Sequence, residues 1–272
     1  MRKRNHKRRN IVLTNLKLCF PEMSADQHQS LLIDHYHAFG ATLLDMGTLF
    51  WGNRDKLKEI VHFPDVGKYN KLNGAGPVIY FTPHMVTIDI GGVAMTNEGA
   101  VVAMMKPVKN ELLHYQVYKS RTRFNEPLLL MRDDGLRKFL QGIKQGYVCY
   151  YAPDEDFGDT KYTEFAPFFA TESSTLTMLG RLCKLSNGVT VPCVTKLNMQ
   201  TGHYEFIIAD PLENFPTGST KNDAMVMNRC MENMIRMALA QYMWTFKLFK
   251  TRPNGEVDPY QKKHANDAET YS

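Results

Sequence analysis

Residues 77–89 read PVIYFTPHMVTID, an apolar run that leads into a histidine and, five positions later, an aspartate. The run from Pro77 to Phe81 is short and bounded by glycine and polar residues, which is typical of a buried strand, and Pro83 favours a break after it. Side chains five positions apart on one helix point about 140° away from each other. His84 and Asp89 therefore meet only if His84 lies on a strand-to-helix turn and Asp89 in the opening turns of the helix.

Short apolar runs of this kind recur along the chain. Further strands are predicted at residues 100–105, 128–131, 147–152, 189–197 and 204–208. Helical patterns lie between several of them, at 111–123, 135–144 and 174–184, and a long amphipathic helix is predicted at 222–248. This alternation indicates an α/β fold with a central mixed, largely parallel sheet flanked by helices.

A helix is also predicted in the N-terminal part of the chain. Ser24 and Gln27 have the spacing of a reciprocal capping box. Apolar side chains then recur at spacings of three and four as far as Phe50, which gives one apolar stripe. Core packing is the commoner use of such a stripe, and contact with lipid is the alternative.

The composition fits one domain over residues 1–272. The chain is 43% hydrophobic, enough to bury a sizeable core. Its formal net charge is +5, and six Lys or Arg residues lie between Arg2 and Arg9. We expect residues 1–10 to form a basic arm that seeks an anionic membrane surface. The tail at 256–272 is polar, follows a Pro-Asn-Gly stop signal and is expected to be loose.

The cysteine pattern and the hydropathy exclude several classes of protein. The five cysteines are scattered and contain no Cys-x-x-Cys pair, which argues against a disulfide framework or a zinc site and favours a reducing, cytosol-facing environment. No apolar run reaches the length of about 18 residues that a membrane-spanning helix needs. No motif that reads nucleic acid accompanies the basic arm, so no nucleic-acid partner is expected.

Two groups of polar residues suggest chemistry. A histidine held by a carboxylate through one ring nitrogen is a general base at the other, which suits deprotonation of an alcohol, although chance His and Asp pairs are common. The acidic run Asp154, Glu155, Asp156 and Asp159 lacks the twelve-residue calcium-loop pattern, so it is more typical of carboxylates that orient Arg or Lys side chains. Arg121 and Arg123 are at helical spacing and fit either a site or a solvated helix face.

The motifs taken together resemble the bacterial late (secondary) lipid A acyltransferases. The resemblance covers nearly the whole chain in order and rests on the basic arm and these segments: residues 15–22 (NLKLCFPE), the His84-x4-Asp89 box, Arg121-x-Arg123, residues 153–158 (PDEDFG), residues 211–216 (PLENFP), residues 241–244 (QYMW) and residues 249–253 (FKTRP). The chain departs from the family pattern at Phe246-Lys247-Leu248, where a His and consecutive Arg residues are usual.

The resemblance implies an enzyme at the cytoplasmic face of the inner membrane, with a fold like that of glycerophosphate acyltransferases. It would move an acyl chain from the phosphopantetheine of acyl carrier protein to a hydroxyl of a lipid A precursor, without a metal or other cofactor. His84 would be the general base, Asp89 its orienting partner and Arg121 the active-site cation. We further expect Arg123, Asp154 and Asp156 to bind substrate.

Two alternatives stay open at this point. One is an acyltransferase of the same dyad class that acts on a glycerophospholipid. The other is a non-catalytic protein that binds anionic lipid or nucleic acid through the basic arm. The family usually begins with an apolar anchor ahead of the basic segment, so we expect either peripheral binding or an anchor upstream of Met1.

Overall fold

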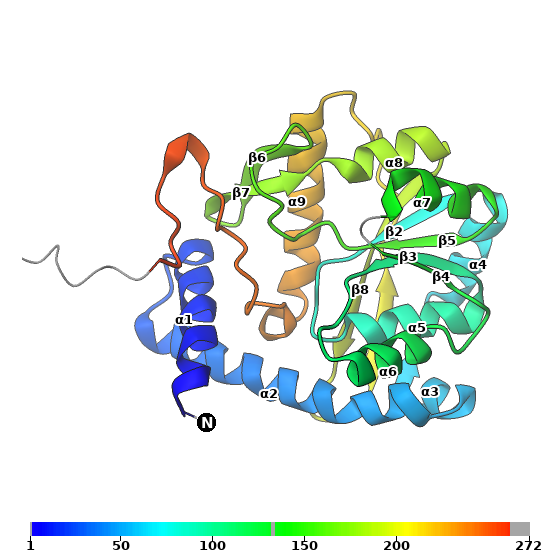
Figure 1. Cartoon of the computed structure of the whole chain (residues 1–272), viewed down its shortest axis with the longest axis horizontal. Coiled ribbons are helices and arrows are strands. Elements are labelled where there is room, and N and C mark those ends of the chain that lie inside the picture. Colours follow the sequence, from blue (N-terminus) through cyan, green and yellow to red (C-terminus); the bar gives the residue numbers. More distant parts are fainter. Residues whose placement is uncertain (1, 132–133, 262–272) are drawn as a thin grey trace, which may run out of the picture.

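A computed structural model describes residues 2–131 and 134–261 and contains a seven-stranded sheet with helices on both faces (Figure 1). The strand order is β1-β9-β8-β2-β5-β3-β4. All neighbouring strands are parallel except β8 and β9, which are antiparallel. The predicted α/β fold with a mixed, largely parallel sheet is therefore confirmed. The strands are β1 (Val61–His62), β2 (Val78–Phe81), β3 (Val101–Met105), β4 (Leu128–Met131), β5 (Val148–Tyr151), β8 (Val189–Leu197) and β9 (Tyr204–Ile208).

The helices form a layer on each side of this sheet. In Figure 1, α7 and α8 lie above the sheet and α5 and α6 lie below it. Alternate side chains of β2 point to opposite faces of the sheet. Ile79 and Phe81 belong to one hydrophobic core, and Val78 and Tyr80 belong to another. A strand buried on both faces needs an unbroken apolar run, which explains its sequence. The helices are α1 (Arg2–Cys19), α2 (Ala25–Trp51), α3 (Arg54–Ile60), α4 (Val66–Ala75), α5 (Ile88–Glu98), α6 (Glu111–Arg121), α7 (Gly135–Lys144), α8 (Met178–Ser186) and α9 (Thr220–Arg236).

The second helix agrees with the sequence pattern, whereas α1 was not predicted as a helix. The Ser24 side chain accepts a hydrogen bond from the Gln27 backbone, and the Gln27 side chain accepts one from the Ser24 backbone, so the predicted capping box is present. The basic arm is the start of α1. None of the described helices has the length and apolar character needed to cross a bilayer.

A hairpin, β6 (Thr163–Phe168) and β7 (Thr171–Leu176), was not predicted. The helix expected at 174–184 begins only at Met178, so the prediction was wrong over its first residues. The turn between the strands carries Phe169 with a positive φ of 52°. Because neither Gly nor Asn marks that turn, the usual sequence signal of a hairpin is missing.

The last helix is shorter than the predicted 222–248. It ends at Arg236, and a short 3-10 turn, Leu239–Gln241, follows it. Beyond this turn Tyr242 and Trp244 are fully buried. Tertiary packing of these two rings overrides an apolar spacing that also fits a helix. A second 3-10 turn, Pro253–Gly255, follows, and the hydroxyl of Tyr260 accepts a hydrogen bond from the Phe249 backbone. Residues 262–272 of the expected polar tail lie outside the described residues.

Candidate active site

His84 lies on the turn between β2 and α5, and Asp89 lies in the first turn of α5, as the sequence predicts. The chain after α9 holds this turn in place. The His84 carbonyl accepts a hydrogen bond of 2.8 Å from the Met243 backbone, and the Val86 backbone donates one of 2.7 Å to the carbonyl of Gln241. The site is thus assembled from segments more than 150 residues apart in sequence.

Asp154 binds His84 at two points. One oxygen of its carboxylate lies 2.5 Å from Nδ1 of the imidazole, and the other accepts a hydrogen bond of 2.8 Å from the His84 backbone. Asp154 follows β5, which neighbours β2 in the sheet, so both residues lie where these parallel strands end. The Asp154 side chain is only 2% exposed and that of His84 is 21% exposed. The contact therefore fixes the ring, with Nδ1 towards Asp154 and Nε2 on the opposite side.

The electrostatics of this pair favour a charged imidazole. Burial lowers the pKa of His84, but the charge of Asp154 and its hydrogen bond outweigh burial, so the pKa is raised above its ordinary value. Burial correspondingly raises the pKa of Asp154, and the charge and hydrogen bonds of His84 more than offset this, so that pKa is lowered. An imidazole in this setting is a stronger base than a free histidine.

Asp89, the expected partner of His84, is paired with Arg121 instead. Nε and Nη2 of the guanidinium lie 2.9 and 2.6 Å from one oxygen of the Asp89 carboxylate. The two residues come from the first turn of α5 and the last turn of α6. Asp89 thus holds the Arg121 guanidinium, while the carboxylate that is hydrogen-bonded to His84 belongs to Asp154.

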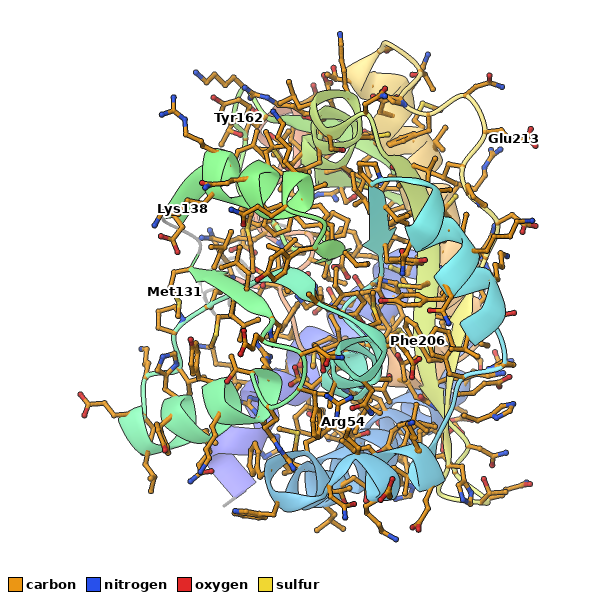
Figure 2. The ribbon with its side chains drawn as sticks, turned by 90° about the vertical axis from the view of Figure 1, so that its right-hand side faces the viewer. Arg54, Met131, Lys138, Tyr162, Phe206 and Glu213 are labelled. Atoms are coloured by element: carbon orange, nitrogen blue, oxygen red, sulfur yellow. The ribbon has the colours of Figure 1, made fainter. Side chains whose placement is uncertain are left out.

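A cavity of about 510 Å³ opens beside these groups. His84, Asp89 and Arg121 line it together with Glu155. Most of its wall is apolar, and the residues of the wall include Gly92, Val93, Val101, Ala103, Met105, Val117, Leu129, Leu136 and Met178. Val101 and Met105 are the two ends of β3, so the cavity follows this strand for about 13 Å. Two elements that contribute to this wall, β4 and α7, lie on the same side of the molecule in Figure 2, where Met131 and Lys138 mark them.

Two charged residues beside His84 were not among the predicted site residues. Glu155 places an oxygen 3.9 Å from Nε2 of His84, and Lys106 forms an ion pair with the same carboxylate. The ring of Phe246 lies against the imidazole, with the two centroids 5.3 Å apart. The acidic run at 154–156 was a signal for Glu155. Lys106 follows β3 without any motif of its own, and only the strand order brings it to the site.

The comparisons with known proteins agree with one another. The family model described as bacterial lipid A biosynthesis acyltransferase matches residues 1–251. The chain belongs to this family. Lipid A biosynthesis acyltransferase 2 of Shigella flexneri is 31% identical over 94% of this chain and 82% of its own length. The lipid A biosynthesis myristoyltransferase and lauroyltransferase of Escherichia coli K12 are each 30% identical over 93% of this chain, and 78% and 83% of their own lengths are covered.

This lipid A acyltransferase also uses two of the expected substrate-binding residues in other contacts. Arg123 donates to the carbonyls of Leu49, at 2.5 Å, and of Gly52, where α2 ends. Asp156 accepts hydrogen bonds from the backbones of Gly158, at 2.8 Å, and of Thr251, at 2.6 Å. Among the described residues, neither lines the cavity. Substrate binding by Arg123 and Asp156 stays a prediction, and their observed contacts hold a helix end and a loop.

Proposed function

We propose that this acyltransferase of lipid A biosynthesis moves a fatty acyl group from acyl carrier protein to a hydroxyl of a lipid A precursor, with His84 as general base. The observation that carries the proposal is the contact of His84 with the buried carboxylate of Asp154 beside a mainly apolar cavity that His84 lines. The enzyme would act at the cytoplasmic face of the inner membrane, where an acyl carrier protein and an anionic lipid meet.

In the proposed reaction, Nε2 of His84 removes the proton of the acceptor hydroxyl. The oxygen attacks the thioester carbonyl and forms a new C–O bond, and the carbonyl oxygen becomes an oxyanion. The oxyanion then collapses, the C–S bond breaks, and the imidazolium returns its proton to the departing sulfur. Asp154 supports the positive charge that the imidazole carries between these two steps.

The apolar cavity offers a place for the acyl chain. Its wall includes residues of β3, α5 and α6, and His84 lines it together with Asp89, Arg121 and Glu155. A fatty chain in this cavity removes apolar surface from water on both partners, which contributes about 25 cal/mol per Å² buried. The thioester carbonyl would then lie next to His84, where the acceptor hydroxyl must arrive.

Arg121 would serve as the cation for this chemistry. Its guanidinium lines the same cavity and is oriented by Asp89. A planar guanidinium grips two oxygens of a phosphate or a developing oxyanion, whereas an ammonium acts as a point charge. The role of Asp89 in this account is to hold Arg121, and that of Asp154 is to orient His84.

Mass spectrometry of reaction products tests the proposal. The purified chain is incubated with an acyl carrier protein donor and a lipid A precursor, and a glycerophospholipid acceptor is run in parallel. We expect one added acyl group on the lipid A precursor, and a loss of about 10²–10⁴-fold in rate for His84→Ala. A His84→Ala variant with more than half of the parent rate would refute the general-base role, and acylation of the glycerophospholipid alone would refute the acceptor.

A further inference from the structure

The side of α6 that faces away from the protein is apolar and aromatic. Leu112, Tyr115 and Tyr118 are 71%, 56% and 42% exposed, respectively. With 3.6 residues per turn, these three side chains fall within about 120° of the helix circumference, together with the exposed Glu111 and Lys119. We call these five residues the outer face of α6. A helix on the surface of a globular protein ordinarily turns its polar residues outward, so this face is inverted.

The inner side of the same helix belongs to the candidate active site. Val117 and Arg121 line the cavity, while Leu112, Tyr115 and Tyr118 do not. Val108, just before the helix, also lines it. The outer face thus belongs to the same helix that lines the cavity beside His84.

On and beside this face, two lysines outnumber the single glutamate, Glu111, so the local charge is positive and suits an anionic surface. The Lys119 ammonium lies 5.8 Å from the centre of the Tyr115 ring, and Lys109 is exposed just before the helix. Glu111 is the acidic residue of the first turn. A helix that carries leucine and tyrosine beside lysine is typical of segments that lie in the boundary between lipid headgroups and acyl chains.

A second exposed aromatic residue lies close to the other end of α6. Arg123, two residues beyond this helix, donates to the carbonyls of Leu49 and Gly52. Trp51 lies between these two residues in sequence and is 73% exposed. Tryptophan is enriched at membrane interfaces, because its ring is apolar and its N–H is polar.

We propose that the outer face of α6 docks this enzyme on an anionic lipid bilayer, with Leu112 and Tyr115 inserted among the headgroups and the helix that lines the cavity held against the membrane. The inference rests on the proposed function, since it assigns a route by which a membrane-held acceptor reaches His84. A bilayer is favoured over an acidic protein partner because the exposed residues of this face are mainly apolar.

Vesicle flotation of the full chain tests the proposal. The vesicles are phosphatidylethanolamine with phosphatidylglycerol, at low and at high salt. We expect the double variant Leu112→Ser/Tyr115→Ser to partition about tenfold less than the parent, at both salt concentrations, because insertion of apolar side chains is not screened by salt. Leu185→Ser is the matched control, since Leu185 is an exposed leucine on α8, which lies above the sheet in Figure 1 whereas α6 lies below it.

Activity measurements separate this proposal from the function itself. The double variant should keep the parent turnover on acceptor dispersed in detergent micelles and lose about tenfold on acceptor held in vesicles. Parent-like flotation of the double variant would overturn the docking face. Loss of flotation in Leu185→Ser to the same extent would also overturn it. Loss of flotation in Trp51→Ser but not in the double variant would place docking on α2. A rise in KM for acyl carrier protein with unchanged flotation would make the face a protein-binding surface.

Discussion

At the scale of single residues, the candidate site contains two separate pairs of a carboxylate with a basic side chain. Asp154 contacts His84, and Asp89 contacts Arg121. The sequence places His84 and Asp89 five positions apart on one turn, which makes them the natural pair. The pairing with Asp154 was not predictable from local spacing, because it depends on the neighbouring positions of β2 and β5 in the sheet.

Arg121→Lys is predicted to lower activity although it keeps the positive charge. Loss of one charge-assisted hydrogen bond costs about 1.5–3 kcal/mol, which corresponds to roughly a ten- to hundredfold loss. Steady-state kinetics assign the role: a higher KM with unchanged kcat indicates a lipid phosphate, and equal losses in kcat and kcat/KM indicate the oxyanion. Asp89→Asn should give the same pattern in weaker form. Parent kinetics in Arg121→Ala would place the residue outside the reaction.

At the scale of elements, six of the seven strands in the described sheet were predicted, whereas the edge strand β1 and the C-terminal segment were not. Fully buried parallel strands require continuous apolar runs, and these are visible in the sequence. Residues 237–248 carry apolar residues at a spacing that suits a helix, yet their packing against the His84 turn is decided by contacts with distant parts of the chain. Gln241 in this segment is an example. Its buried side-chain amide accepts a hydrogen bond from the backbone N–H of Leu197 and donates one to the Leu197 carbonyl, each of 2.7 Å.

Gln241→Ala is predicted to destabilise the fold by about 1–3 kcal/mol, because it leaves the buried N–H and carbonyl of Leu197 without their partner. Urea denaturation measures the effect. The exposed Gln200 provides the control, and Gln200→Ala should stay within about 0.5 kcal/mol of the parent. Activity should fall in Gln241→Ala alone, since the segment also holds the His84 turn. Equal stability of the two variants would show that this segment does not brace the site.

At the scale of the whole molecule, the cavity extends from the candidate site along β3 and is lined there by residues of α5 and α6. The curated relatives include transferases named for different acyl groups, myristoyl and lauroyl. Family membership therefore leaves the acyl chain of this protein open. In the proposed placement of the acyl chain, the side chains along β3 set the space available for it.

Ala103→Leu is predicted to shift the donor preference towards shorter chains, because Ala103 lies halfway along β3 on the cavity wall. Added methyl and methylene groups in a hydrophobic pocket discriminate between substrates by about tenfold or more. Competition between myristoyl and decanoyl donors, read by mass spectrometry of the product, measures the shift. Ala103→Gly is the matched variant and should favour the longer donor. No change in the product ratio for either variant would place the acyl chain outside this cavity.

The most direct test of the account is the pH dependence of kcat/KM in the parent and in Asp154→Asn. The base must be neutral to act, so activity falls as pH drops through the pKa of His84, which Asp154 holds above the ordinary value near 6.5. We predict that Asp154→Asn moves this acid limb to lower pH and lowers the plateau by about 10²–10⁴-fold, while Asp89→Asn leaves the limb in place. A parent-like profile in Asp154→Asn, or the shift in Asp89→Asn instead, would contradict the account.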